Sequence, residues 1–155
     1  MRNTWNKAVY KEIQVMDMEQ IIREKLVEIE NKENVRIIMA VESGSRAWGF
    51  ASPDSDYDVR FVYVRNLEDY LKLEKTRDVI EWQLDDTLDI SDWDLKKALQ
   101  LMHESNPSIF EWCASSIVYR YSPAFEELRE IRKEYYSKKK SLYHYWHMAN
   151  SNYEN

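Results

Sequence analysis

The chain has 155 residues, the length of one folded domain with room for a helical extension. Its 44% hydrophobic and 14% aromatic residues are enough to fill a core, and its 32% charged residues predict a well-solvated surface. With 22 basic and 28 acidic residues the net charge is -6, so the overall charge does not mark a nucleic-acid binder, and an anionic substrate would need a bound cation or a local basic patch.

The first predicted elements are a helix and a buried strand. Apolar residues from Met18 to Ile29 follow the spacing of an amphipathic helix, with Asp17 as its expected N-cap and Asn34 as its end. Residues 35–41 (VRIIMAV) form a nearly continuous, β-branched apolar run, which predicts a strand covered on both faces.

A second strand and a mainly helical C-terminal half are expected after a loop. Residues 57–64 (YDVRFVYV) predict a strand, Asn66 is expected to cap a short helix through Leu73, and Ser91 is expected to start a longer helix. Asn106-Pro107 interrupts this helical part. The other predicted elements are strands at 78–84 and 87–90, a short helix around 109–112, an extended segment at 115–121, and helices from Ser122 through Ile131 and over 137–153. This order predicts an α+β or α/β sandwich.

The two glycines of the chain, Gly44 and Gly49, fall within six residues of each other. Glycine is used where the backbone needs a positive φ or where another group approaches closely. Ser43-Gly44-Ser45 directly follows the predicted buried strand, and we expect it to turn into a helix with free backbone N–H groups. Such groups bind phosphate, so this loop is a candidate phosphate cradle.

Asp56 and Asp58 are two residues apart at the start of the second strand, so their side chains should leave the same face. Two ionised carboxylates this close repel each other unless a cation lies between them, and hard oxygen ligands suit Mg²⁺. A simpler interpretation treats residues 52–55 (SPDS) as an ordinary β-turn and both aspartates as solvated surface residues.

The stretch ESGSRAWGFASPDSDYDVRFVYV resembles the signature of the DNA polymerase β superfamily of nucleotidyltransferases. In that signature an apolar strand leads into Gly-Ser, and an Asp-x-Asp begins the next strand. The wording is similar to the predicted bacterial nucleotidyltransferases of the YcgL-like, RNA-repair-associated branch, and further similarity lies in LDISDWDLKKAL, SNPSIFEW, SSIVY and KSLYHYWHMA. The resemblance covers roughly residues 8–150. It implies an α+β nucleotidyltransferase (polymerase β-like) fold, a short mixed sheet backed by helices with a C-terminal helical segment.

The resemblance also implies a third carboxylate on a neighbouring strand. Asp89 is our choice because the apolar residues on either side of it would direct its side chain off a strand toward a cleft. Asp94 is also explained as a helix-start residue, and Asp92 as a charge in the first helical turn. The full set of candidates is Asp85, Asp86, Asp89, Asp92 and Asp94.

The activity implied by the resemblance is transfer of a nucleotide from a nucleoside triphosphate to RNA, a protein or a small molecule. Asp56, Asp58 and Asp89 would hold Mg²⁺ or Mn²⁺ and act as catalytic residues. Ser43, Gly44 and Ser45 would bind the phosphates, and Arg46 either reaches a phosphate or is solvated. A non-catalytic nucleotide-binding or antitoxin-like partner-binding module is the alternative, and hydrolysis is a third, weaker one.

The same comparison predicts a division of the chain at residue 121. Residues 1–121 are expected to form the nucleotidyltransferase domain, and 122–155 a helical segment that would be a truncated second lobe. The single cysteine, Cys113, excludes an internal disulfide and fits a reducing compartment. The N-terminus lacks the apolar core of a signal peptide, and no apolar run approaches the roughly 18 residues that span a bilayer. We therefore expect a cytoplasmic protein that does not bind membranes.

Overall fold

The computed structural model describes residues 3–52, 55–80, 82–83 and 87–153. Over these residues it forms a five-stranded mixed sheet with strand order β3-β4-β2-β1-β5. Strands β2 and β4 are parallel, and the other neighbouring pairs are antiparallel. The elements are α1 (Asn3–Glu33), β1 (Arg36–Glu42), β2 (Tyr57–Val64), α2 (Leu67–Leu71), β3 (Trp82–Gln83), β4 (Leu88–Asp94), α3 (Leu95–His103), α4 (Pro107–Ala114), β5 (Val118–Arg120), α5 (Pro123–Tyr135) and α6 (Lys138–Tyr153). The expected α+β class and mixed sheet backed by helices are confirmed.

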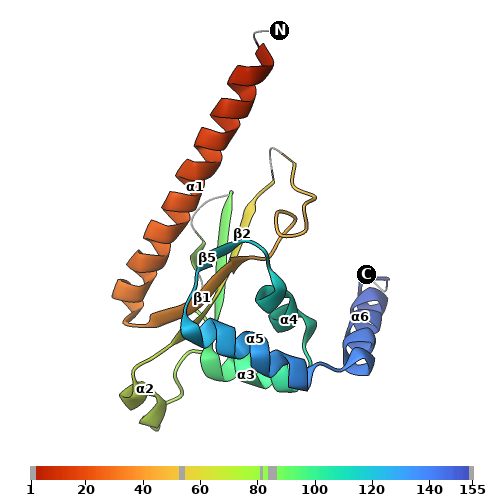
Figure 1. Cartoon of the computed structure of the whole chain (residues 1–155). Helices are drawn as coiled ribbons and strands as arrows, with labels where there is room; N and C mark the ends of the chain where they lie inside the picture. Colours follow the sequence, from red (N-terminus) through yellow and green to blue (C-terminus); the bar gives the residue numbers. More distant parts are fainter. Residues whose placement is uncertain (1–2, 53–54, 81, 84–86, 154–155) are drawn as a thin grey trace.

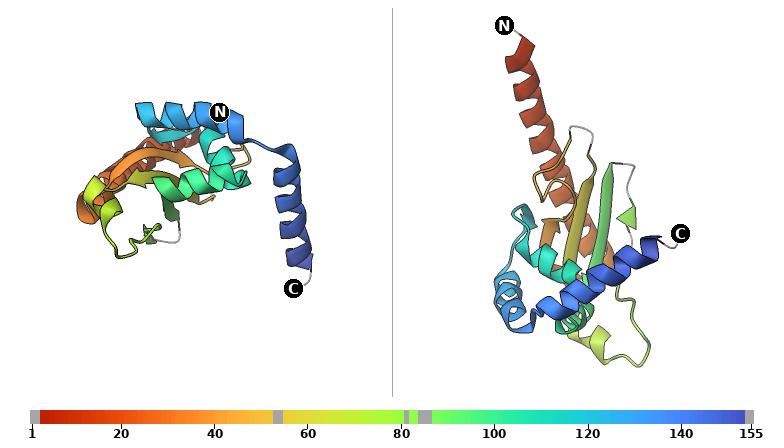
Figure 2. Two further views of the ribbon diagram at one scale, coloured as in Figure 1. Left: turned by 90° about the horizontal axis from the view of Figure 1, so that it is seen from below. Right: turned by 90° about the vertical axis from the view of Figure 1, so that its right-hand side faces the viewer.

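Helices cover both faces of the sheet (Figures 1 and 2). Helix α1 packs on one face through Ile22, Leu26 and Ile29, against strand residues such as Phe61. Helices α3, α4 and α5 pack on the other face, in a second core that contains Met39. The six residues of β1 after Arg36 are all buried, because this strand lies between the two cores. The prediction of a strand covered on both faces is therefore confirmed.

Helix α1 is much longer than its apolar spacing indicated. It begins at Asn3, so Asp17 lies within the helix and is not its N-cap; that prediction is wrong. Figure 1 shows that the N-terminal half of α1 extends beyond the sheet. The predicted end is confirmed: Asn34 has a φ of 51°, and the N–H of Val35 donates to the carbonyl of Glu30 at 3.1 Å.

The strand predicted at 87–90 runs four residues further. β4 continues to Asp94, because Ser91 and Asp92 pair in register with Arg60 and Phe61 of β2. The predicted helix start at Ser91 is therefore wrong. Helix α3 follows Asp94, whose carboxylate accepts from the N–H of Lys96. Of the strand predicted at 78–84, the described residues form only the two-residue β3, and residues 81 and 84 lie outside the description.

The C-terminal elements follow the predicted order. Asn106 caps α4 by accepting from the N–H of Ser108, and Ser122 caps α5. Helix α5 buries Phe125 and Leu128 in the second core, whereas α6 stands apart from the sheet (Figure 2). The short helix after Asn66 is confirmed as α2, although it ends two residues before the expected Leu73. No helix among the described residues is long and apolar enough to cross a membrane.

Candidate functional site

Asp58 and Asp89 lie side by side on neighbouring parallel strands. They are register partners in the pairing of β2 with β4. Because side chains alternate along a strand, both leave the sheet on the same face as Val62 and Trp93, which pack in the core with α3, α4 and α5. Their side chains are 32% and 53% exposed, respectively. The structure thus brings two of the three predicted catalytic aspartates together in a place that a ligand can reach.

Arg60 connects these two carboxylates. Its Nη2 donates to Oδ2 of Asp89 at 2.7 Å and to Oδ1 of Asp58 at 3.4 Å. Its Nη1 donates to the backbone carbonyl of Val59 at 3.1 Å. The guanidinium is only 18% exposed, so it balances the charge of both aspartates from within the protein. The sequence placed Arg60 on the same strand face but gave no indication of this role.

The other aspartate candidates have separate surroundings. Asp56 is exposed and precedes β2, two residues from Asp58 as predicted. Asp92 is fully buried, and its Oδ1 accepts from the N–H of Ile80 at 2.6 Å, so its interpretation as a charge in the first helical turn is wrong. Asp94 is the N-cap of α3, which confirms its explanation as a helix-start residue. Asp85 and Asp86 lie outside the described residues.

The Ser43-Gly44-Ser45 segment connects β1 to the start of β2. The N–H of Ser43 donates to the carbonyl of Asp58 at 2.8 Å. A Cβ on Gly44 would lie 1.8 Å from Oδ2 of Asp58, so the absence of a side chain at Gly44 makes room for that carboxylate. The following residues form consecutive turns, and the expected helix is not present. Within the described chain, the N–H groups of Gly44, Ser45 and Arg46 have no hydrogen-bond acceptor. Of the three predicted free amides, those of Gly44 and Ser45 have no acceptor among the described residues, whereas that of Ser43 is used within the fold.

Arg46 holds the two ends of the loop together. Its Nε donates to the carbonyl of Asp56 at 3.1 Å, and its Nη2 donates to the carbonyl of Ser55. The guanidinium also lies over the ring of Tyr57, 3.8 Å from the ring centroid. These contacts account for Arg46 structurally. Its predicted contact with a phosphate stays a prediction.

Glu42 is a site residue that the sequence did not reveal. It is fully buried at the end of β1, where Oε1 accepts from the N–H of Asp58 at 2.8 Å and Oε2 accepts from the hydroxyl of Tyr119 at 2.6 Å. The hydroxyl of Ser115 donates to the carbonyl of Glu42 at 2.6 Å. Burial, with the hydrogen bond to Glu42, raises the pKa of Tyr119 well above its ordinary value. A charged residue ending an otherwise apolar strand was the available signal.

Comparison with known sequences agrees with this geometry. The profile of RlaP, described as the RNA repair pathway DNA polymerase beta family, matches residues 18–155. The chain belongs to this family. It is also 50% identical over 136 residues to the uncharacterized protein YcgL of Bacillus subtilis (strain 168), an alignment that covers 87% of this chain and 52% of YcgL. The chain thus spans about half the length of this curated relative.

Members of a polymerase β family are expected to use a divalent cation, which would need oxygen ligands grouped around one point. No three His, Cys, Asp or Glu side chains among the described residues are placed to hold a metal ion together. The pair of Asp58 and Asp89 still has suitable chemistry, because Mg²⁺ binds through one or two carboxylates plus water and phosphate oxygens. Arg60 now contacts these oxygens. The donor set therefore fits a hard cation once Arg60 turns away.

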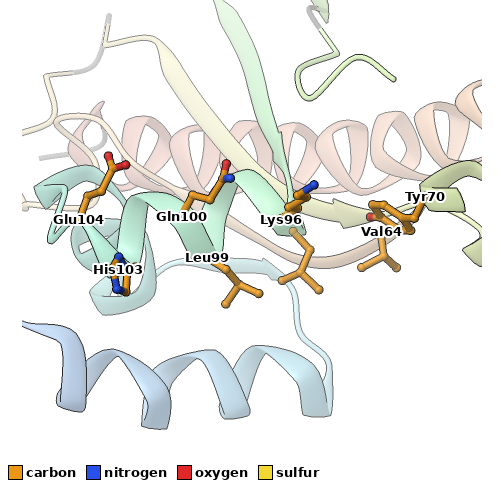
Figure 3. Close-up of a pocket in the computed structure, with 8 residues that line it drawn as sticks. Val64, Tyr70, Lys96, Leu99, Gln100, His103 and Glu104 are labelled. Carbon is orange, nitrogen blue, oxygen red and sulfur yellow. The ribbon is translucent and has the colours of Figure 1, made fainter. Parts of the chain in front are cut away.

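A separate cavity of about 470 Å³ lies on the exposed side of α3 (Figure 3). Val64, Tyr70, Leu99 and His103 are among the residues that line it. Val64 ends β2, whereas Asp58 lies near the start of that strand, so this cavity is at the opposite end of the strand from the aspartates. It takes no part in the candidate site.

Proposed function

We propose that the protein is a Mg²⁺-dependent nucleotidyltransferase of polymerase β-like fold, which moves a nucleotide from a nucleoside triphosphate to an acceptor hydroxyl. The observation that carries this proposal is the register pairing of Asp58 with Asp89 directly beside Gly44. Asp56, Asp58 and Asp89 are the proposed catalytic residues; Asp58 and Asp89 are the pair proposed to hold the metal first, and Asp56, which the described structure does not place around one point with them, is the proposed third ligand. Residues 1–121 are the proposed catalytic domain, 122–155 the helical segment, and the cytoplasm the compartment.

The loop supplies the phosphate-binding part of this proposal. The backbone N–H groups of Gly44, Ser45 and Arg46 have no acceptor in the described structure, and three such donors in succession suit phosphate oxygens. Ser43 fixes one end of the loop through its bond to the carbonyl of Asp58. Phosphates held here would lie next to the carboxylate of Asp58, because Gly44 and Asp58 are in van der Waals contact.

The proposed reaction is an in-line displacement. The acceptor oxygen forms a bond to the α-phosphorus while the bond from that phosphorus to the bridging oxygen breaks, and pyrophosphate leaves. Asp89 takes the proton of the acceptor hydroxyl, a role that suits its half-exposed carboxylate. Arg60, once released from the aspartates, pairs with phosphate. A bound Mg²⁺ would supply charge neutralisation of the phosphate oxygens.

The family description makes RNA the first acceptor to test, with a protein or a small molecule as the others. We would incubate the protein with Mg²⁺, each of the four α-³²P-labelled triphosphates, and candidate RNAs or protein fractions. Label should enter an acceptor with wild type and fall by at least about a hundredfold with Asp58→Asn, since metal and positioning carry such reactions. Glu68→Gln, on the exposed surface of α2, is the matched control. Equal labelling by Asp58→Asn would contradict the proposed site, and release of labelled nucleoside monophosphate alone would indicate hydrolysis.

A non-catalytic nucleotide-binding or partner-binding module is the second candidate. The observation that favours it is the pairing of Arg60 with both Asp58 and Asp89, because this guanidinium already neutralises the charge that a metal would otherwise balance. This function predicts stoichiometric binding of nucleotide, with no label in any acceptor and no pyrophosphate released.

A further inference from the structure

A cavity of about 550 Å³ lies between the turn at Trp48, helix α4 and the first turns of α6. Four aromatic side chains line it: Trp48, Phe110, Tyr136 and Tyr145. Phe110 is buried and packs edge-on against Tyr136, with 5.3 Å between the ring centroids. The other three aromatic residues are about half exposed, so their rings are accessible to a ligand. The volume is in the range of small-molecule sites.

Ser141 is among the residues that line the same cavity, and it carries a buried hydroxyl. Ser141 is only 6% exposed, and its Oγ has no hydrogen-bond partner among the described residues. A buried hydroxyl without a partner is unfavourable, and a ligand that hydrogen-bonds to it restores the lost interaction. A residue of the cavity wall therefore carries a hydroxyl that the described residues do not satisfy.

Charged groups lie around the aromatic rings. The carboxylate of Glu111 accepts from the hydroxyl of Tyr145. The Nη1 of Arg132 donates to the carbonyl of Phe110 at 3.3 Å, and Arg132 is among the residues that line the cavity. The wall thus combines acceptor and donor groups with exposed ring faces. A nucleobase needs this combination, because it stacks through its face and hydrogen-bonds through its edge.

The cavity is adjacent to the proposed phosphate loop. A smaller hollow of about 60 Å³, lined by Ser43 and Ala47, shares Trp48, Glu111 and Ala114 with it. Trp48 follows the free amides of Gly44, Ser45 and Arg46 in the same loop. A molecule with its phosphates on the loop can therefore extend its ring system past Trp48 into the cavity.

We propose that this cavity binds a nucleobase of the substrate. The base belongs either to the donor triphosphate or to the terminal nucleotide of an RNA acceptor, and both present the same chemistry. Trp48 stacks on the base, Glu111 and Ser141 hydrogen-bond to its edge, and Arg132 adds positive charge. This inference rests on the proposed function for the placement of the phosphates.

Binding experiments on the whole chain separate the contribution of the base from that of the phosphates. Isothermal titration with Mg²⁺ compares the non-transferable α,β-methylene analogues of the four triphosphates with ribose 5-triphosphate, which has the phosphates but no base. Fluorescence anisotropy measures the binding of a short, labelled oligoribonucleotide to the protein. Trp48→Ala should lower the affinity for the ligand whose base occupies the cavity, either the triphosphate analogue or the oligoribonucleotide, by about tenfold. This is the size of a lost stacking interaction between an aromatic side chain and a base. It should leave ribose 5-triphosphate unchanged, and Trp48→Phe should restore most of the affinity.

Ser141→Ala should lower the affinity for the same ligand, while the stacking of its base on Trp48 is kept. Tyr143→Ala is the matched control, because Tyr143 is on α6 but lines a different cavity. Loss of triphosphate affinity assigns the cavity to the donor base, and loss of RNA affinity assigns it to the acceptor base. If Trp48→Ala and Ser141→Ala bind both ligands as wild type does, the inference is wrong.

The labelling assay with Asp58→Asn, run in parallel, distinguishes this failure from failure of the proposed function. Absence of transfer by the wild type together with base affinity lost in Trp48→Ala would overturn the proposed function and leave the cavity assignment in place. Transfer lost in Asp58→Asn with base affinity unchanged in Trp48→Ala would overturn only the cavity assignment.

Discussion

A β-carbon on Gly44 would lie 1.8 Å from Oδ2 and 2.7 Å from Cγ of Asp58, so the backbone of the loop occupies the space directly against that carboxylate. Gly49 is a glycine for a different reason. It has a φ of +76°, and a Cβ there would meet nothing within 4 Å. One glycine of the loop therefore gives space to the site, and the other allows the turn.

Replacing Gly44 with Ala should displace Asp58. The methyl group cannot be accommodated unless the Asp58 side chain rotates, which would also disturb its contact with Arg60. We expect a loss of about 1–3 kcal/mol in unfolding free energy, measured with urea, as for other overpacked positions. Binding of Mn²⁺, followed by electron paramagnetic resonance, should be lost. Gly49→Ala should cost about 1 kcal/mol through backbone strain and leave Mn²⁺ binding intact. Normal Mn²⁺ binding by Gly44→Ala would contradict the proposed role of Asp58.

Arg60→Gln should increase the affinity of the nucleotide-free protein for Mn²⁺. The guanidinium pairs with Asp89 at 2.7 Å and with Asp58 at 3.4 Å, so removing it leaves two neighbouring carboxylates without a counter-charge. A change of about tenfold in Kd is expected for a charge removed at this distance near the surface. The double variant Arg60→Gln with Asp89→Asn should lose this gain. Unchanged Mn²⁺ affinity in Arg60→Gln would show that the pair is not a metal site.

Tyr119→Phe should destabilise the protein through Glu42. The Tyr119 hydroxyl donates to Oε2 of this fully buried carboxylate at 2.6 Å, and no solvent replaces a lost donor there. We expect about 1.5–3 kcal/mol less unfolding free energy, the range for hydrogen bonds to charged groups. Tyr121→Phe is the control, because Tyr121 is 57% exposed and its contact to Glu126 is 3.3 Å long. Equal midpoints for the two variants in urea unfolding would exclude a structural role for the Tyr119–Glu42 bond.

Much of the site could be predicted because it depends on short-range pattern. The apolar run of β1, the alternation along β2 and the apolar residues flanking Asp89 each report which side of a strand a residue occupies. Two carboxylates predicted on separate strands then come together because β2 and β4 pair in register. The capping residues Asn106 and Ser122 were predictable for the same reason, since a cap acts within its own turn.

The features that could not be predicted depend on partners far away in the sequence. The carboxylate of Glu42 accepts hydrogen bonds from the N–H of Asp58 and the hydroxyl of Tyr119, and Arg60 pairs with Asp89. The extension of β4 was hidden because Ser91 and Asp94 have the spacing of a helix start, whereas pairing with β2 keeps the chain extended. Pairing with a neighbouring strand overrode the local preference there. As a result, Asp92 is in the core rather than on a helix.

The burial of Asp92 predicts a distinct dependence of stability on pH. Burial raises the pKa of Asp92 from 3.8 to about 7; Glu33 adds to this effect, whereas the N–H of Ile80, Arg65 and Lys97 oppose it. The unfolded chain releases the proton near pH 4, but the folded protein keeps it until about pH 7. The contribution of Asp92 to the free energy of unfolding should therefore be highest below pH 4. It should fall by on the order of 3–4 kcal/mol as the pH rises to about 7.

Asp92→Asn isolates this contribution. Asparagine keeps an Oδ1 that accepts from the N–H of Ile80, and it carries no proton that the folded state must release. The variant should be modestly more stable than wild type at pH 5 and more stable by a few kcal/mol at pH 8, because the unfolded wild type releases its proton from about pH 4 and only the wild type has to bury a carboxylate at pH 8. Urea unfolding of both proteins between pH 5 and pH 8 measures the difference. Parallel curves over that range would show that Asp92 has the same pKa in the folded and unfolded states, and that its Oδ2, which has no partner among the described residues, is stabilised in some other way.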